Sequence, residues 1–300
     1  MTESILMVAN AKAGSAEARA IATARSTLLA DRAVEFRETS DPHELDGVVN
    51  DLDDRTLVVA GGDGSLHAAV NALHRGGKLE MTVVGLIPLG TGNDLARSAR
   101  IPLDPINAAR VVLNGEPREH DLLISDEETI AINAVHLGIG AEAVRAGSRA
   151  KAMLGPAGYP VGAVLAGTRY TGWDLDVVVD GQKQFRDGRV LMVGISVGRT
   201  IGGGTPLAPG AEVDDGLADV TVASSTGPVR RARFAARLRA GQHPQLRDVV
   251  TTRGRVTTVT GDAVRANVDG EVSGPQEHWT WTLRPHAWRL IHSRGRQSLT

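Results

Sequence analysis

Three glycines surround an aspartate in the stretch Gly61-Gly62-Asp63-Gly64-Ser65. The apolar run Leu57 to Ala60 before it is typical of a buried strand, and the apolar residues after it recur at helical spacing. Backbone N–H groups of such a glycine loop can approach an oxyanion, and the dipole of the following helix favours the same charge. The stretch predicts a phosphate-binding turn before a helix that Ser65 caps. The alternative is a structural turn whose glycines serve only close packing.

Asp63 distinguishes this loop from common nucleotide-binding loops, because a carboxylate repels a polyphosphate unless a cation or a donor lies between them. A magnesium nucleotide resolves that conflict. The dinucleotide pattern G-x-G-x-x-G is not met, since position 67 is His, and nothing matches G-x-x-x-x-G-K-[ST]. The sequence therefore disfavours ordinary dehydrogenase and Walker-type sites.

The elements that must hold this loop change in character near residue 120. Before it, buried strands alternate with helices, which predicts a doubly wound parallel sheet whose ligands bind at the carboxyl ends of the strands. From Arg118 onward, short alternating runs predict a β-rich, antiparallel, sandwich-like domain. We expect an α/β nucleotide domain at 1–120 and a β-rich substrate domain at 121–284, with 285–300 returning to the first.

The composition excludes several classes of protein. Lys and Arg total 33 against 35 Asp and Glu, so a net charge of -2 argues against nucleic acid as a partner. No cysteine is present, which excludes disulfides and thiol catalysis. No apolar run approaches the roughly 20 residues that span a bilayer. We expect a cytoplasmic protein, at most peripheral at the inner face of the membrane; the oligomeric state is open, and a homodimer is compatible.

Further motifs follow the glycine loop at wide spacing along nearly the whole chain. In order they are Asn10 to Gly14, Gly61 to Ser65, Pro88-Leu89-Gly90-Thr91-Gly92-Asn93-Asp94, Gly138-Ile139-Gly140, Gly202-Gly203-Gly204 with Ala208-Pro209, Asp214-Asp215-Gly216-Leu217, and Val268-Asp269-Gly270-Glu271. Together they resemble the diacylglycerol kinase catalytic family, which includes bacterial lipid kinases and is related to sphingosine and ceramide kinases. The resemblance implies transfer of the γ-phosphoryl group of ATP to a lipid hydroxyl, most simply that of diacylglycerol.

The resemblance also implies roles for residues. Glu271, in the Asp269-Gly270-Glu271 turn, is the expected general base, and Asp269 is the second expected catalytic residue, although Asp-Gly between apolar runs is by itself a hairpin signal. ATP is expected to bind Asn10, Gly14, Thr39, Gly61, Gly62, Asp63, Gly64, Ser65, Leu66, His67, Thr91 and Asn93.

Two metal sites are implied in the same way. Asp63, Asp94 and Asp121 are expected to organise Mg²⁺ and water near the phosphates; for isolated aspartates a helix cap or turn is the alternative, and Asp94 could cap the helix through Leu95. A second, structural metal site is expected at Glu212, Asp215 and Leu217.

This sequence departs from the family pattern at Ser15, Ser65, His67 and Ala68, which leaves the polar contacts that support the phosphate loop open. Two other functions therefore stay in competition. An NAD kinase shares the Gly-Gly-Asp-Gly loop, and a weakened lipid- or nucleotide-binding module is compatible with the departures.

The stretch Pro228 to Arg239 contains five arginines around an apolar stripe of Phe234, Ala235 and Leu238. Such a helix either contacts an anionic membrane surface or packs its stripe on the sheet. Trp279, Trp281 and Trp288 are expected to be packing residues.

Overall fold

The computed structural model describes residues 4–11, 14–139, 141–142, 172–184, 188–224 and 227–294. The chain divides into two compact units, each built from its own internal contacts. The N-terminal unit comprises Met1–Asp121 and Pro285–Thr300, and the C-terminal unit comprises Leu122–Arg284. The sequence also predicts a helical piece near Ala141 to Met153, and most of this range lies outside the described residues.

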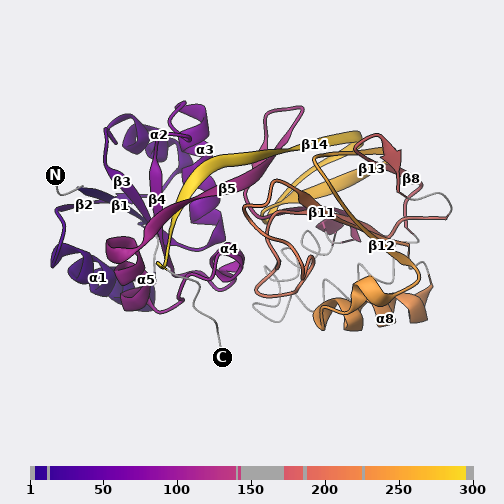
Figure 1. The fold of residues 1–300 in the computed structure, drawn as a ribbon, viewed down its shortest axis with the longest axis horizontal. Helices are drawn as coiled ribbons and strands as arrows, with labels where there is room; N and C mark the ends of the chain where they lie inside the picture. Colours follow the sequence, from indigo (N-terminus) through magenta and orange to yellow (C-terminus); the bar gives the residue numbers. More distant parts are fainter. Residues whose placement is uncertain are drawn as a thin grey trace. The chain divides into compact units, whose positions relative to one another are not determined.

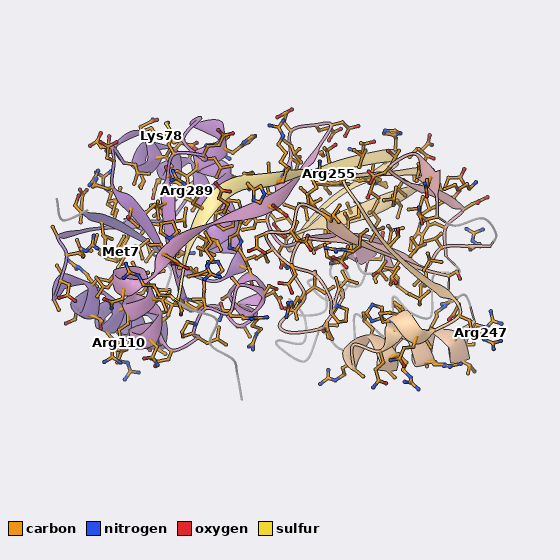
Figure 2. The ribbon with its side chains drawn as sticks, viewed as in Figure 1. Met7, Lys78, Arg110, Arg247, Arg255 and Arg289 are labelled. Atoms are coloured by element: carbon orange, nitrogen blue, oxygen red, sulfur yellow. The ribbon has the colours of Figure 1, made fainter. Side chains whose placement is uncertain are left out.

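The N-terminal unit contains a parallel sheet in the order β14-β4-β3-β1-β2. Its strands are β1 (Ile5–Asn10), β2 (Val34–Thr39), β3 (Thr56–Gly61), β4 (Val83–Pro88) and the last residues of β14 (Glu271–His292). The near-continuous apolar runs of β1 and β3 are fully buried, as a sheet covered on both faces requires. Met7, labelled in Figure 2, has no exposed surface.

Helices cover both faces of this sheet. In Figure 1, α1 and α5 lie on one side of the strands and α2 and α3 on the other. The helices are α1 (Ser15–Leu29), α2 (Pro42–Asn50), α3 (Asp63–Arg75), α4 (Asp94–Ser98) and α5 (Pro105–Asn114). The predicted doubly wound α/β arrangement is thus confirmed.

The start of α3 differs from the expectation. Gly62 is the N-cap and the helix begins at Asp63, so Ser65 lies inside the first turn and does not cap it. The N–H of Ser65 already donates to the carbonyl of Gly62 at 3.1 Å. Because glycine can cap a helix through its extended backbone alone, the helix begins three residues earlier than the serine indicated.

The C-terminal unit is built from antiparallel strands, as predicted. Its main sheet has the order β12-β11-β10-β7-β13, and β13 continues into β14 through a hairpin. The long strand β13 pairs with β8 at its start and with β7 at its end, which brings two layers of strands together. The strands are β5 (Glu116–Ser125), β6 (Ile130–Ala131), β7 (Ala134–Gly138), β8 (Leu175–Val179), β9 (Gln182–Lys183), β10 (Met192–Ser196), β11 (Ala218–Ala223), β12 (Val249–Gly254), β13 (Val256–Val268) and the first part of β14.

The sequence did not predict β12. It has no apolar alternation after Val250, because it is the outermost strand of the sheet and only β11 pairs with it. All three tryptophans of the last strand pack in the interior, with at most 4% of their surface exposed.

The arginine-rich helix α8 (Pro228–Arg239) packs two residues of its apolar stripe inward, while the third, Ala235, is exposed. Phe234 is buried in a cluster with Leu207 and Leu246, and Leu238 lies against it. The packing alternative therefore describes Phe234 and Leu238. Among the described residues, no helix combines the length and the apolar character that crossing a bilayer needs.

Candidate functional site

The predicted nucleotide-binding residues of the N-terminal unit gather at one edge of its sheet. Asn10 ends β1 and pairs with Thr39, the last residue of β2, while Gly61 ends β3 beside Pro88 of β4. Gly14 precedes α1 as its N-cap, and exposed Thr91 follows β4. Carboxyl ends of parallel strands are where doubly wound sheets bind ligands. The fold thus collects loops that are up to 80 residues apart in sequence.

Glycines pack the two central loops of this edge against each other. A Cβ on Gly62 would lie 2.9 Å from the Cα of Gly90, and a Cβ on Gly90 would lie 2.5 Å from the Cα of Gly62. The N–H of Leu89 donates to the carbonyl of Gly61 at 3.0 Å. Gly62 and Gly90 therefore serve close packing, which is the role that the alternative of a structural turn assigned to the glycines of this loop. Gly64 differs, since it is exposed and a Cβ there would meet nothing within 4 Å.

Asn93 shapes the second loop. Its backbone is left-handed, with φ of 52°, and its side chain bonds Gly90 twice, accepting from the N–H at 3.0 Å and donating to the carbonyl at 2.6 Å. Leu66 and His67 point inward from α3 with 1% and 8% of their surface exposed. A nucleotide would thus contact mainly the backbone of these two residues. The departure from the family pattern at His67 concerns a side chain of the protein interior.

Asp63 and Asp94 lie close enough for their charges to interact. The Asp63 carboxylate accepts the N–H of Leu95 at 3.2 Å, so Asp63 serves the start of α4, where Asn93 rather than Asp94 is the N-cap. Burial raises the pKa of Asp63, backbone hydrogen bonds lower it, and the charge of Asp94 raises it. A cation would relieve the burial and repulsion of these two carboxylates. The two acids therefore fit a Mg²⁺ site linked through water.

Asp121 and the two acids of the second predicted metal site bond protein groups: a backbone N–H for Asp121 and arginines for Glu212 and Asp215. Asp121 is fully buried, and its carboxylate accepts the N–H of His286 at 2.9 Å. Glu212 and Asp215 pair with Arg199 and Arg253. Among the described residues, no three His, Cys, Asp or Glu side chains are placed to hold a metal ion together. The residues around Glu212 and Asp215 do not fit a divalent cation, because guanidinium groups occupy the carboxylates.

Several hydrogen bonds hold the turn before Glu271 in the C-terminal unit. Asp269 and Gly270 both have positive φ, 47° and 104°, as the two central residues of a type I′ hairpin turn require. The Asp269 carboxylate accepts three backbone N–H groups, from Ile132 at 2.6 Å, Asn133 at 3.1 Å and Ala134 at 2.8 Å. Glu271 is exposed, and its carboxylate makes no hydrogen bond or ion pair with any described residue. A fixed turn thus presents a carboxylate that no described side chain engages.

Two asparagines complete this support, and sequence reasoning missed both. Asn267 is 2% exposed, and its side-chain oxygen accepts the N–H of Gly270 at 3.0 Å. The side-chain NH₂ of Asn133 donates to the carbonyl of Thr200 at 2.9 Å. The backbone carbonyl of Asn133 accepts the N–H groups of Val197 and Gly198. The available signal was an Asn two residues before Asp-Gly, a residue type that commonly bonds nearby backbone.

His136 lies beside Asn267 across the β7–β13 ladder. Burial lowers the pKa of His136 to about 4, against the opposing charge of Asp269. This imidazole is therefore neutral at physiological pH.

Comparisons with known proteins match both units of the chain. Residues 4–124 match the family described as diacylglycerol kinase catalytic domain, and residues 133–292 match the YegS C-terminal NAD kinase beta sandwich-like domain. A "Probable lipid kinase YegS-like" protein of Pseudomonas aeruginosa (strain UCBPP-PA14) is 35% identical over 233 residues, 73% of this chain and 72% of the relative. Its namesake in Xanthomonas oryzae pv. oryzae (strain MAFF 311018) is 31% identical over 232 residues, 72% of each chain.

The crystal structure of a diacylglycerol kinase from Bacillus anthracis str. Sterne shares the fold. It aligns with a TM-score of 0.71 at 18% identity and covers 97% of each chain. The glycine-loop edge, the Asp-Gly-Glu turn and these matches lead to one conclusion: the chain belongs to the diacylglycerol kinase-like family of lipid kinases and is a kinase.

Proposed function

We propose that the protein transfers the γ-phosphoryl group of ATP to the hydroxyl of diacylglycerol or a closely related lipid. The observation that carries this proposal is the exposed carboxylate of Glu271, which pairs with none of the described residues and lies on a turn that Asp269 fixes through three backbone hydrogen bonds. In the reaction Glu271 takes the proton of the lipid hydroxyl. The lipid oxygen then forms a bond to the γ-phosphorus as the bond between that phosphorus and the ADP oxygen breaks.

ATP binding is assigned to the carboxyl edge of the N-terminal sheet. Exposed Gly64, in the first turn of α3, leaves backbone N–H groups open to phosphate, and the helix dipole favours the negative charge. Mg²⁺ would be held near Asp63 and Asp94 and would screen the phosphate charge from these carboxylates.

The lipid substrate places the reaction at a membrane surface, which we assign to the cytoplasmic side. The outer face of α8 supports this proposal, because Arg230, Arg233 and Arg239 are exposed and the helix contains no acidic residue. Since Phe234 and Leu238 of its apolar stripe pack inward, contact would be mainly electrostatic.

Transfer of labelled γ-phosphate to vesicle-borne lipids and to NAD tests the proposal. Glu271→Gln should lower transfer to diacylglycerol by about 10²- to 10⁴-fold with nucleotide binding intact. Glu277→Gln, an exposed glutamate on the same strand, is the control and should leave the rate unchanged. Phosphorylation of NAD instead of lipid would favour the NAD kinase alternative, and nucleotide binding without any transfer would favour a binding module.

A further inference from the structure

Three arginines bind the oxygen atoms of the segment that leads into β11. The guanidinium of Arg199 lies with Nη2 2.5 Å from the carboxylate of Glu212, and its Nε donates to the carbonyl of Ala211 at 2.8 Å. The Nε of Arg255 donates to the carbonyl of Gly216 at 3.3 Å. Arg199 thus holds the start of the segment, at Ala211 and Glu212, and Arg255 holds its turn at Gly216.

Arg253 holds the middle of the segment. Its Nη2 bonds the carboxylate of Asp215, and its Nε lies 3.3 Å from the carboxylate of Asp219. Asp219 and Arg253 are direct partners across the β11–β12 ladder, so the strand register sets this contact. The second oxygen of Asp215 accepts the N–H of Leu217 at 3.1 Å, which leaves the carboxylate bonded at both oxygens.

These are the oxygens that a divalent cation would need. Mg²⁺ and Ca²⁺ bind carboxylate and carbonyl oxygens, and here guanidinium groups engage three carboxylates and two carbonyls of the segment. A metal ion among them would lie next to three positive charges. Arginine suits this role because its planar fork stays charged and bonds several oxygens in fixed directions.

We infer that Arg199, Arg253 and Arg255 replace a structural divalent cation in this chain and hold residues 211–219 on the β11–β12 edge without metal. This inference concerns the packing of the C-terminal unit and does not depend on the proposed kinase reaction.

Segment-resolved hydrogen–deuterium exchange of the full-length protein tests the inference, without nucleotide, in chelator and in millimolar Ca²⁺ or Mg²⁺. In the wild-type protein the exchange of residues 211–219 should be the same in all three conditions. Arg253→Gln should speed that exchange severalfold, since charge-assisted hydrogen bonds to two carboxylates are lost. Arg247→Gln is the control, because Arg247 is exposed and makes no hydrogen bond or ion pair with a described residue.

Two results would overturn the inference. One is a wild-type segment whose exchange slows in Ca²⁺ or Mg²⁺ or speeds in chelator. The other is an Arg253→Gln segment that exchanges like that of Arg247→Gln. If Arg253→Gln does not fold, Arg199→Gln removes the contacts with Glu212 and Ala211 and is judged by the same two criteria. The readout is local and independent of catalysis, so its outcome is separate from that of the transfer assay.

Discussion

Asp269 and Ala134 bond to each other in both directions. The N–H of Ala134 donates to the Asp269 carboxylate at 2.8 Å, and the N–H of Asp269 donates to the carbonyl of Ala134 at 3.1 Å. This reciprocal contact joins the β13–β14 turn to the start of β7. On the turn side the contact is made by Asp269, two residues before Glu271. An acid that appears in sequence to be a second catalytic carboxylate thereby serves to position the turn.

Removing the charge of Asp269 should loosen this turn. In Asp269→Asn one carboxylate oxygen becomes an NH₂ donor that faces backbone N–H groups, and hydrogen bonds to a charged acceptor contribute about 1.5–3 kcal/mol each. We expect a lower urea midpoint and a large fall in kcat with an unchanged KM for ATP. Glu277→Gln is the control. A normal urea midpoint with full activity would contradict a positioning role for Asp269.

Gly90 and Gly64 should respond in opposite ways to a methyl group. Gly90→Ala drives a Cβ into the Cα of Gly62 and should destabilise the protein and weaken nucleotide binding together. Gly64→Ala places its Cβ in open space within α3 and should stabilise the helix by about 0.5–1 kcal/mol. Chemical unfolding and binding of a non-hydrolysable ATP analogue measure both effects.

The Gly64→Ala result also tests the phosphate site. A variant that is more stable yet binds the ATP analogue less tightly would indicate that the ligand approaches the backbone at Gly64. Unchanged affinity would argue against that contact.

Buried histidines should make the protein acid-sensitive. The pKa of His136 is lowered to about 4 by burial, against 6.5 for an exposed imidazole. Burial, the charge of His292 and that of Arg118 also lower the pKa of His120. Below pH 6.5 the unfolded chain binds more protons than the folded one, so stability that is complete above pH 6.5 is lost as the pH falls toward 4.

The effect of His136 can be isolated by mutation. His136 accounts for up to about 3 kcal/mol of this loss by the linkage relation. His136→Leu should flatten the dependence of the urea midpoint on pH between 4.5 and 7. His43→Gln, whose side chain is 92% exposed in the native protein, should not change it. Equal slopes in all three proteins would show that His136 is not responsible.

The exposed arginines of α8 should govern binding to anionic vesicles. Replacing Arg230, Arg233 and Arg239 with Gln removes about 1 kcal/mol each, so affinity should fall on the order of 100-fold at low salt. The matched control replaces Arg19, Arg100 and Arg110, which are exposed on the N-terminal unit. Vesicle sedimentation measures binding, and equal losses in both triple variants would show that overall charge rather than α8 drives it.

Much of the fold followed from local patterns. The apolar runs of β1 and β3 and the amphipathic face of α3 were predicted closely, because burial on both faces or on one face leaves a period in the sequence. The edge strand β12 and the true start of α3 were not, since an edge strand needs little apolar pattern and a glycine N-cap has no side chain to recognise it. The parallel and antiparallel halves were distinguished correctly.

The sequence by itself determined the fold class, the kinase family and the set of residues around which a site could form. Only the tertiary structure decided what each acid does: Asp269 bonds three N–H groups from 135 or more residues away, Asp63 serves α4, and Asp215 pairs with Arg253. The physical reason is that a carboxylate has the same sequence signature whether it takes a backbone donor, a guanidinium or a cation. Its partner is set by strand register and loop packing, which join residues far apart in the chain.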